Sequence, residues 1–122
     1  MADFKAINFK EKLAKFDDLW SPKVIAEMND YQFKLVKVKD EFVWHKHDNT
    51  DEVFLVLDGQ LTILFRDSKV ELSAGEMFVV LKNTEHKPVA KEECHILLIE
   101  PKGLVNTGKV GGDKTAKNDI WV

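Results

Sequence analysis

The sequence predicts an all-β protein, an antiparallel sandwich or barrel built from short strands. From Lys23 onward apolar and polar side chains alternate, which is the period of a strand with one buried face. The polar breaks between these segments are short enough to be hairpin turns. At 122 residues the chain can bury one hydrophobic core, so we expect a single domain over residues 1–122.

A helical pattern occurs only near the N-terminus. Phe9, Leu13 and Phe16 recur at three- and four-residue steps among lysines. We therefore expect a short amphipathic helix between Ile7 and Trp20, within an N-terminal segment of residues 1–19.

The barrel is expected over about residues 20–100. Its first two strands flank a turn at Asn29-Asp30, and the alternation slips in phase at Leu35-Val36, where we expect a bulge. The remaining strands are expected at Phe42–His47, Val53–Leu57, Leu61–Arg66, Val70–Leu72, Met77–Leu81, His86–Ala90 and Cys94–Glu100. Residues 101–122, rich in Gly, Lys, Asn and Asp, predict an irregular C-terminal arm.

Charge and cysteine content limit the partners and the compartment. The net charge is −3 and Arg66 is the single arginine, so neither nucleic acid nor a membrane surface is an expected partner. A lone cysteine, Cys94, fits a reducing compartment. The N-terminus lacks the pattern of a signal peptide, and no apolar run reaches the ~20 residues of a membrane span, so we expect a cytoplasmic protein.

One cluster of residues could carry chemistry. His45 and His47 are two apart in an expected strand, so they share a face, and Glu52 begins the returning strand. His86 comes from a distant segment. Three imidazoles and a carboxylate suit one divalent transition ion (Fe, Mn, Ni, Zn or Cu) better than Ca or Mg. The alternative is that the histidines are solvated strand residues and that Asp51 and Glu52 belong to a charged turn.

The spacing of these residues resembles a known pair of motifs. The run from His45 to Gly59 (HxH, four residues, E, six residues, G) resembles the first motif of the cupin superfamily at every fixed position. The run from Gly75 to His86 resembles the second motif. In it, Leu81 replaces the usual proline, Asn83 replaces a glycine, and Ala90 stands where the family has a closing asparagine. Asparagine tolerates positive φ, so we expect Asn83 to keep the turn.

The resemblance implies both a fold and a ligand set. From about Trp20 to Glu100 the chain looks like the small single-domain cupins that are similar to the barrel domain of phosphomannose isomerases. This implies a double-stranded β-helix, or jelly-roll barrel, with a short N-terminal helix and an irregular C-terminal arm. It also implies that the metal ligands are His45, His47, Glu52 and His86. Asp51 could substitute for Glu52, although the motif spacing favours Glu52.

The reaction is left open, because cupins include isomerases, dioxygenases, decarboxylases, regulators and storage proteins. The first hypothesis is a metal-dependent enzyme acting on a small polar, sugar-like molecule, by Lewis-acid chemistry such as isomerisation or by dioxygenation. Four protein ligands on an octahedral ion would leave two positions for substrate or dioxygen. The alternatives are a non-catalytic module that binds a small ligand, and a structural or storage protein. No catalytic residue beyond the ligands is assigned.

Four other residues receive a structural interpretation first. We expect His95 to be a buried structural histidine and Cys94 a small core residue. Tyr31 is expected in the core, with a general acid in the barrel as the alternative. Arg66 is expected at a salt-bridged strand end, and it would hold an anionic substrate only if it faced the lumen.

A homodimer is expected from the apolar side chains that a small barrel cannot cover. Val53–Leu57 is apolar on both faces, so its outer face needs the helix, the arm or a second subunit. Trp44 faces away from the histidines by parity, and we expect it to meet the helix or a partner subunit. Trp121 in the arm is another residue expected to be buried against a partner.

Overall fold

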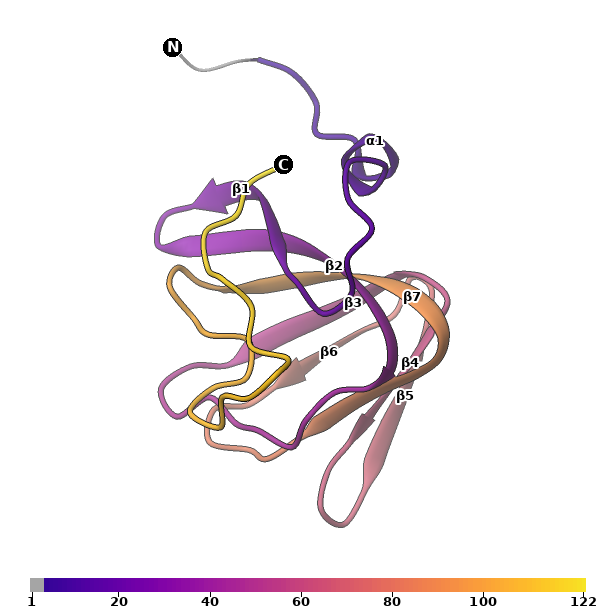
Figure 1. The fold of residues 1–122 in the computed structure, drawn as a ribbon, viewed down its shortest axis with the longest axis vertical. Helices are drawn as coiled ribbons and strands as arrows, with labels where there is room; N and C mark the ends of the chain where they lie inside the picture. The colour runs from indigo at the N-terminus through magenta and orange to yellow at the C-terminus, as the bar shows by residue number, and fades with distance from the viewer. Residues whose placement is uncertain (1–3) are drawn as a thin grey trace.

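The computed structural model describes residues 4–122 and places one short helix and seven strands in them (Figure 1). The elements are α1 Phe9–Leu13, β1 Lys23–Met28, β2 Tyr31–Glu41, β3 Glu52–Asp58, β4 Gln60–Leu64, β5 Lys69–Ser73, β6 Met77–Val80 and β7 Lys87–Pro101. The all-β prediction is confirmed.

Strand β7 organises the sheet. The strand order is β1-β2-β7-β3-β6, with β4 pairing to both β5 and β7, and the pairings between these strands are antiparallel. One half of β7 pairs with β3, from His95 to Ile99, and the other half pairs with β4, from Lys87 to Val89. Because β7 bends while it stays paired with β2, the sheet curls around a closed interior (Figure 1).

The predicted break at Lys91–Glu93 is a bulge inside one strand, not a turn between two strands. Strand β2 pairs Val38 with Cys94 and Asp40 with Ala90. An advance of two residues along β2 therefore corresponds to four residues along β7. The three charged residues at this point are exposed. Such a bulge bends a strand, and here it lets β7 change its neighbour from β4 to β3.

The bulge predicted at Leu35-Val36 is wrong. Strand β2 continues straight through these residues, and the irregular positions lie between Val24 and Ala26 and between Val38 and Asp40. The alternation slips because both faces of β2 are buried at this point: Leu35 is 0% exposed on the outer face and Val36 is 3% exposed in the interior.

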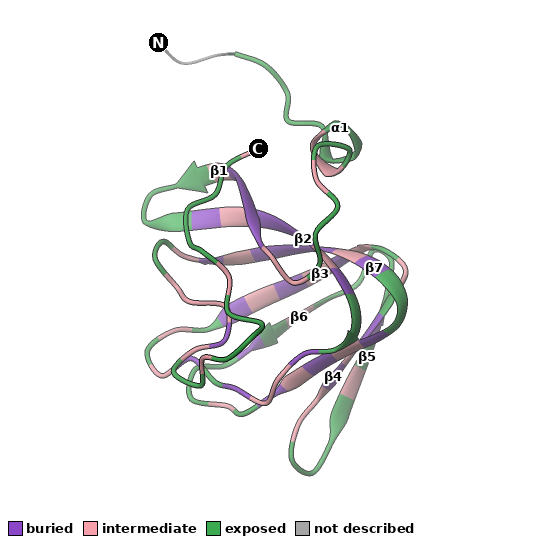
Figure 2. Ribbon diagram, in the orientation of Figure 1, coloured by how far each residue is buried: buried purple, intermediate pink, exposed green. Residues whose placement is uncertain are grey.

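Two apolar clusters cover the two faces of the sheet. Buried and half-buried residues follow one another along its strands in Figure 2. The larger one fills the barrel interior. In the smaller one, Ile25, Leu35 and Leu97 on the outer face pack with Leu13 and Phe16 and with other apolar side chains, namely Phe33, Leu55, Leu57 and Val122. The second apolar face of β3 is therefore covered in part by the N-terminal segment and the chain end, as its sequence required.

The N-terminal helix is shorter than expected. It spans Phe9–Leu13, with Asn8 at its N-cap accepting a hydrogen bond from the Glu11 N–H at 2.9 Å. A helix reaching Trp20 would hold Asp17 and Asp18 in its last turn, where the helix dipole disfavours negative charge. The chain continues without helical structure, and Trp20 adopts a positive φ of 58°.

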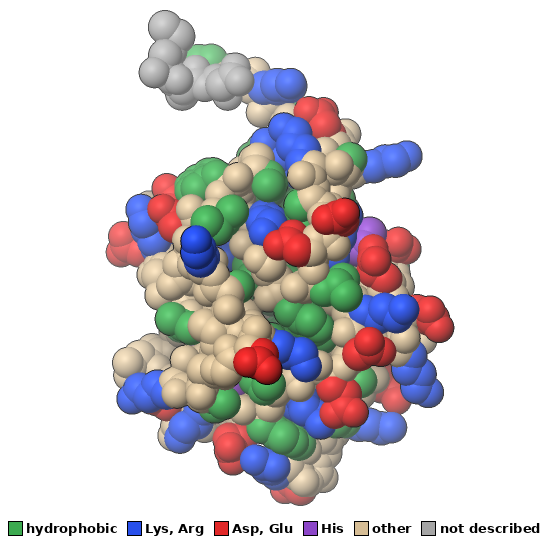
Figure 3. Space-filling view, in the orientation of Figure 1, with side chains coloured by type: hydrophobic (Ala, Val, Ile, Leu, Met, Phe, Trp, Pro, Cys, Tyr) green, Lys and Arg blue, Asp and Glu red, His purple; other side chains and the backbone are tan. Residues whose placement is uncertain are grey.

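The C-terminal arm crosses one side of the barrel and ends beside β1 (Figure 1). The Val24 N–H donates to the Ile120 carbonyl at 2.7 Å, and the Val122 N–H donates to the Val24 carbonyl at 3.2 Å. On the face shown in Figure 3, acidic and basic side chains are interspersed, without a broad area of one sign. Residues 4–122 contain no helix that is long and apolar enough to cross a membrane.

Candidate metal centre

Two backbone hydrogen bonds place His45 beside His86. The His45 N–H donates to the His86 carbonyl at 3.0 Å, and the His86 N–H donates to the His45 carbonyl at 2.9 Å. This single antiparallel bridge is the regular pairing of the segment, so the strand predicted at Phe42–His47 is wrong. The segment lines the end of the barrel as irregular chain, in which side chains need not alternate.

The turn of the second motif supports the neighbouring histidine. The Asn83 N–H donates to the His47 carbonyl at 2.7 Å, and Asn83 has a φ of 62°. Asparagine therefore adopts the left-handed conformation that the usual glycine would adopt, as predicted. The replacement of proline by Leu81 does not prevent the entry of His86 into the interior, since His86 is 0% exposed.

The predicted residues converge on one point. His45, His47, Glu52 and His86 are all buried, and one possible ligand atom from each lies within 4.8 Å of the others. Glu52, the first residue of β3, places Oε1 3.5 Å from Nε2 of His47 and 3.7 Å from Nε2 of His86.

Backbone carbonyls set the proton positions on two of the rings. Nδ1 of His45 lies 2.9 Å from the Val43 carbonyl oxygen, and Nδ1 of His86 lies 2.8 Å from the Thr84 carbonyl oxygen. A carbonyl oxygen can only accept, so both Nδ1 atoms donate. In the neutral ring, Nε2 then carries the lone pair with which imidazole binds a metal.

Buried atoms without partners show that this cluster fits a cation. In residues 4–122, Nε2 of His47, Nε2 of His86 and Oε1 of Glu52 are buried and have no hydrogen-bond partner. Buried polar atoms in native proteins are rarely left unpaired, because each costs roughly 1–3 kcal/mol. A metal ion bound to these lone pairs would remove that cost. The four side chains could therefore hold one ion.

The surroundings of His45 and Glu52 keep these two side chains in their metal-binding ionisation states. It lowers the pKa of His45 from 6.5 to about 4, with a further contribution from His86, so this ring is neutral at pH 7. Burial also opposes the charge on Glu52, but the Glu100, His47 and His86 side chains outweigh it and hold the pKa of Glu52 well below its ordinary value. A neutral imidazole and an ionised carboxylate are the forms that bind metal.

A second buried carboxyl lies behind Glu52. Glu100 is 1% exposed, and its side chain contacts that of Glu52. Lys34 is 2% exposed and places Nζ 2.9 Å from Oε1 of Glu100. Burial, followed by the charge of Glu52, holds the pKa of Glu100 well above its ordinary value, whereas Lys34 acts in the opposite direction.

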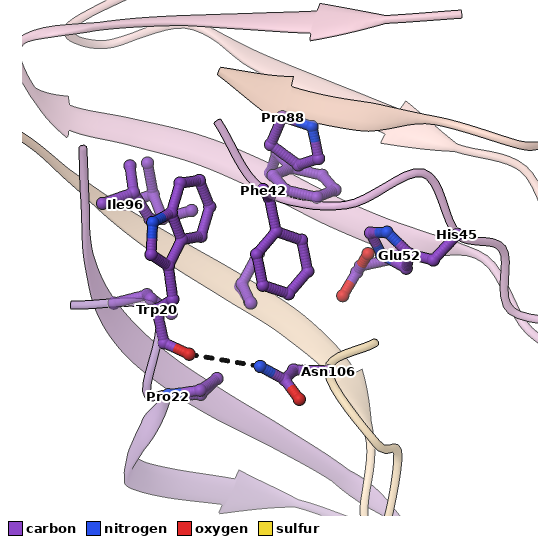
Figure 4. A pocket seen from close by; sticks show the side chains of 12 residues that line it. Trp20, Pro22, Phe42, His45, Glu52, Pro88, Ile96 and Asn106 are labelled. Carbon is purple, nitrogen blue, oxygen red and sulfur yellow. Dashed lines mark hydrogen bonds between the residues drawn. The ribbon is translucent and has the colours of Figure 1, made fainter. Parts of the chain in front are cut away.

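A mainly apolar cavity opens onto the cluster (Figure 4). Its empty space, including the open mouth, is about 350 Å³. Three lining residues are polar: His45, Glu52 and Asn106. The apolar lining consists of Trp20, Pro22, Val36, Val38, Phe42, Phe54, Pro88, Ile96 and Leu98.

Trp20 and Asn106 form one wall of this cavity. The Trp20 ring stacks on Phe42 with centroids 4.6 Å apart, and its Nε1 donates to the Lys39 carbonyl at 2.9 Å. Nδ2 of Asn106 donates to the Trp20 carbonyl at 3.1 Å (Figure 4). The C-terminal arm therefore supplies a polar group to the cavity and holds its aromatic wall.

Three other residues named from the sequence lie outside the cluster. Tyr31 is 43% exposed on the outer face, so neither core packing nor a role as a general acid in the barrel fits it. His95 is half-buried on the outer face, with Nε2 2.7 Å from Oε2 of Glu93, and is not the buried core residue we expected. Asp51 accepts from the Lys82 N–H at 2.8 Å and does not join the cluster.

Arg66 and Trp44 pack against each other on the outer surface. The Arg66 guanidinium lies 3.9 Å from the Trp44 ring centroid, and Arg66 also pairs with Glu85 at 3.4 Å. Trp44 thus faces away from the ligands, as predicted, but it meets Arg66 instead of the helix. Cys94 is fully buried, and burial raises its thiol pKa to about 11, as expected of an inert core cysteine.

The sequence interpretation missed the residues around the ligands, chiefly Lys34, Glu100 and Asn106. One signal was present for Lys34. Val36 and Val38 show that the even-numbered face of β2 turns inward, and Lys34 lies on that face. Nothing in the sequence indicates that Asn106 reaches the cavity, because irregular chain brings it there.

The chain was compared with known proteins. A family model described as "Cupin domain" matches residues 33–100, which is more than half of the chain. The chain belongs to the cupin family. The motif resemblance is thereby confirmed, and the cluster lies where the two cupin motifs meet.

Three cupin relatives illustrate the range of similarity. A cupin-2 domain containing protein from Shewanella frigidimarina NCIMB 400 is 64% identical, with a TM-score of 0.78, over 79% of this chain and 94% of that chain. Protein NMB1881 from Neisseria meningitidis is 32% identical, with a TM-score of 0.73, over 80% of this chain and 100% of that chain. The uncharacterized protein YdbB of Bacillus subtilis (strain 168) is 37% identical over 76% of this chain and 77% of its own.

Proposed function

We propose that this cupin is a metal-dependent enzyme that acts on a small molecule at one divalent transition ion. The observation that carries the proposal is the convergence of His45, His47, Glu52 and His86, with unpaired buried lone pairs, beside a cavity that His45 and Glu52 help to line. Such an ion supplies Lewis-acid chemistry or, if it is iron, dioxygen chemistry. The protein supplies the ligands, their ionisation states and an apolar chamber.

The cavity lining favours dioxygenation over isomerisation. An isomerase that moves a proton between carbon atoms needs a positioned acid or base besides the metal ligands. Asn106 is the one polar lining residue that is not a ligand in the proposed set, and an amide does not serve in that role. Oxidation by dioxygen at the ion depends less on a positioned acid or base than isomerisation does.

The lining also argues against the sugar-like substrate expected from the sequence. A sugar carries a hydroxyl on almost every carbon, and each hydroxyl buried without a partner costs roughly 1–3 kcal/mol. Apolar and aromatic walls, with Trp20 stacked on Phe42, suit a small planar ligand instead. One polar group on this ligand would face the ion. Asn106 already donates both amide hydrogens, to the Trp20 and Lys114 carbonyls, so it could only accept a second hydrogen bond through Oδ1.

Non-catalytic binding is the second candidate, favoured by the same scarcity of acid–base groups in the cavity. Oxygen uptake and ligand titration by calorimetry separate the two. The protein would be loaded with Fe²⁺ under argon and offered phenol, catechol and glucose. Uptake with a phenolic probe supports the enzyme, whereas saturable binding without uptake supports the binding module. Tight binding of glucose, with no binding of either phenolic compound, would contradict the apolar-ligand assignment.

We also propose that a second copy of this chain covers the outer face of β3 and β6. Met77, Val79 and Leu81 are 54%, 38% and 63% exposed there, next to half-buried Val53. Within residues 4–122, β6 pairs with β3 alone, so its other edge is free.

Light scattering should give twice the chain mass for the natural protein and for Val110→Glu, an exposed control in the arm. Val79→Glu should be monomeric, and a monomeric natural protein would refute the dimer.

A further inference from the structure

The most unusual charges of this protein lie inside the barrel, directly behind the carboxylate of the cluster. Lys34 on β2 and Glu100 on β7 are 2% and 1% exposed, although such residues are almost never fully buried unless paired. Their charged atoms are 2.9 Å apart. Burying an ion pair costs several kcal/mol in desolvation, so a pair held this deep needs a reason besides stability.

The sheet register brings this pair to Glu52. Strand β3 pairs Val53 with Ile99 and Phe54 with Leu98. One step further in the same antiparallel register, Glu52 lies beside Glu100, and the side chains of these two residues make contact. A continuous line of buried groups therefore runs from Lys34 through Glu100 to Glu52, the first residue of β3 and a member of the cluster.

If both carboxyl groups in this line are ionised, the line carries one negative charge in excess unless a cation binds beside it. One lysine faces two carboxyl groups, and the three imidazoles at the cluster add no negative charge. Two carboxylates in contact repel each other unless positive charge lies on both sides of them or a proton lies between them. Lys34 supplies positive charge on the Glu100 side, and a metal ion at the cluster would supply it on the Glu52 side.

We propose that Glu100, anchored by Lys34, is a positioning residue that holds the Glu52 carboxylate in place for the metal ion. Glu100 is not among the four side chains whose possible ligand atoms converge. It acts through Glu52, as residues that hydrogen-bond a metal ligand do in other metal sites, where their loss typically costs 10–100-fold in affinity. The inference rests on the metal site of the proposed function.

The opposing interpretation is an ion pair that only seals the barrel end. Both interpretations predict a less stable protein when Glu100 is changed, so stability does not separate them. A change in the coordination of the bound ion does separate them, because a sealing pair has no influence on the ligands.

Cobalt binding provides that measurement. Metal-free natural protein, Glu100→Gln and Glu100→Asp would be titrated with Co²⁺ against a competing chelator, and the visible spectrum of the bound ion recorded. The aspartate variant keeps the carboxyl group but draws it back by one methylene, and it replaces the glutamine variant if that one does not fold. The matched control is Glu93→Gln, on the same strand, whose carboxylate pairs with His95 on the outer face.

We expect Glu100→Gln and Glu100→Asp to bind Co²⁺ roughly 10–100-fold more weakly, with a shifted visible spectrum. Glu93→Gln should match the natural protein in both respects. Natural affinity and an unchanged spectrum in the Glu100 variants would overturn the positioning role while the metal site stands. If the natural protein itself binds no Co²⁺, the metal site fails and the positioning role fails with it.

Discussion

The stability of the metal-free protein should depend on the ionisation of His45. His45 is only 3% exposed, and this burial lowers the pKa of its ring from 6.5 to about 4. In the unfolded chain the ring takes up a proton near its ordinary pKa of about 6.5. Between pH 6.5 and pH 4 the unfolded state therefore binds more protons than the folded state. Stability is full above this window and is lost as the pH falls through it.

The size of the effect follows from the two pKa values. At pH 5 the unfolded ring is almost fully protonated, whereas about one folded molecule in ten is, so this residue removes about 2 kcal/mol of stability relative to pH 7.5. At pH 4 the loss approaches 3 kcal/mol. These are large fractions of the stability of a small domain.

Urea unfolding in the presence of a chelator measures this loss. The comparison protein is His45→Asn, whose side-chain amide can still donate to the Val43 carbonyl but does not titrate. From pH 7.5 to pH 5 the natural protein should lose about 2 kcal/mol more than the variant. Between pH 8 and pH 9 the difference in stability between the two proteins should be constant. An equal loss in both proteins on acidification would refute the assignment of a buried neutral ring.

Three further changes test the site and its support. His47→Ala should no longer bind metal, yet should keep the far-ultraviolet circular dichroism of the barrel, because the fold rests on strand packing; an unfolded variant would contradict this. Gly59→Ala should destabilise the protein by more than Gly75→Ala in urea unfolding. Both glycines have positive φ, but only at Gly59 would a Cβ meet backbone atoms, at 3.1 Å; equal costs would refute the crowding. Trp20→Leu should weaken the binding of a planar probe by up to about tenfold in calorimetry without changing metal content, since it removes the stack on Phe42; unchanged probe affinity would contradict that wall.

The positions of the ligands could be predicted from sequence because they depend on short-range spacing. The interval from His45 to Glu52 spans one turn, and the interval from Gly75 to His86 spans β6 and the turn after it. The two segments join through the bridge between His45 and His86. Gly59 shows the same dependence: its positive φ of 91° lets it pack against the β7 bulge at Cys94.

The surroundings of the ligands could not be predicted, because they depend on long-range packing. A strand with both faces buried, such as β2 at Leu35 and Val36, loses the alternation that reports which face turns inward. The exposed charges of Lys91–Glu93 have the composition of a turn, although they form a bulge in a continuous strand. Glu100 acquires its role only through pairing with two strands distant in sequence.

The most direct test of the metal site is the metal content of the protein purified without added metal. Elemental analysis should find close to one transition ion per chain, and metal-free protein should take up one equivalent of Fe²⁺, Mn²⁺, Ni²⁺ or Zn²⁺. Metal-free protein that remains empty after soaking with all four ions would contradict the assignment of His45, His47, Glu52 and His86 as a metal centre.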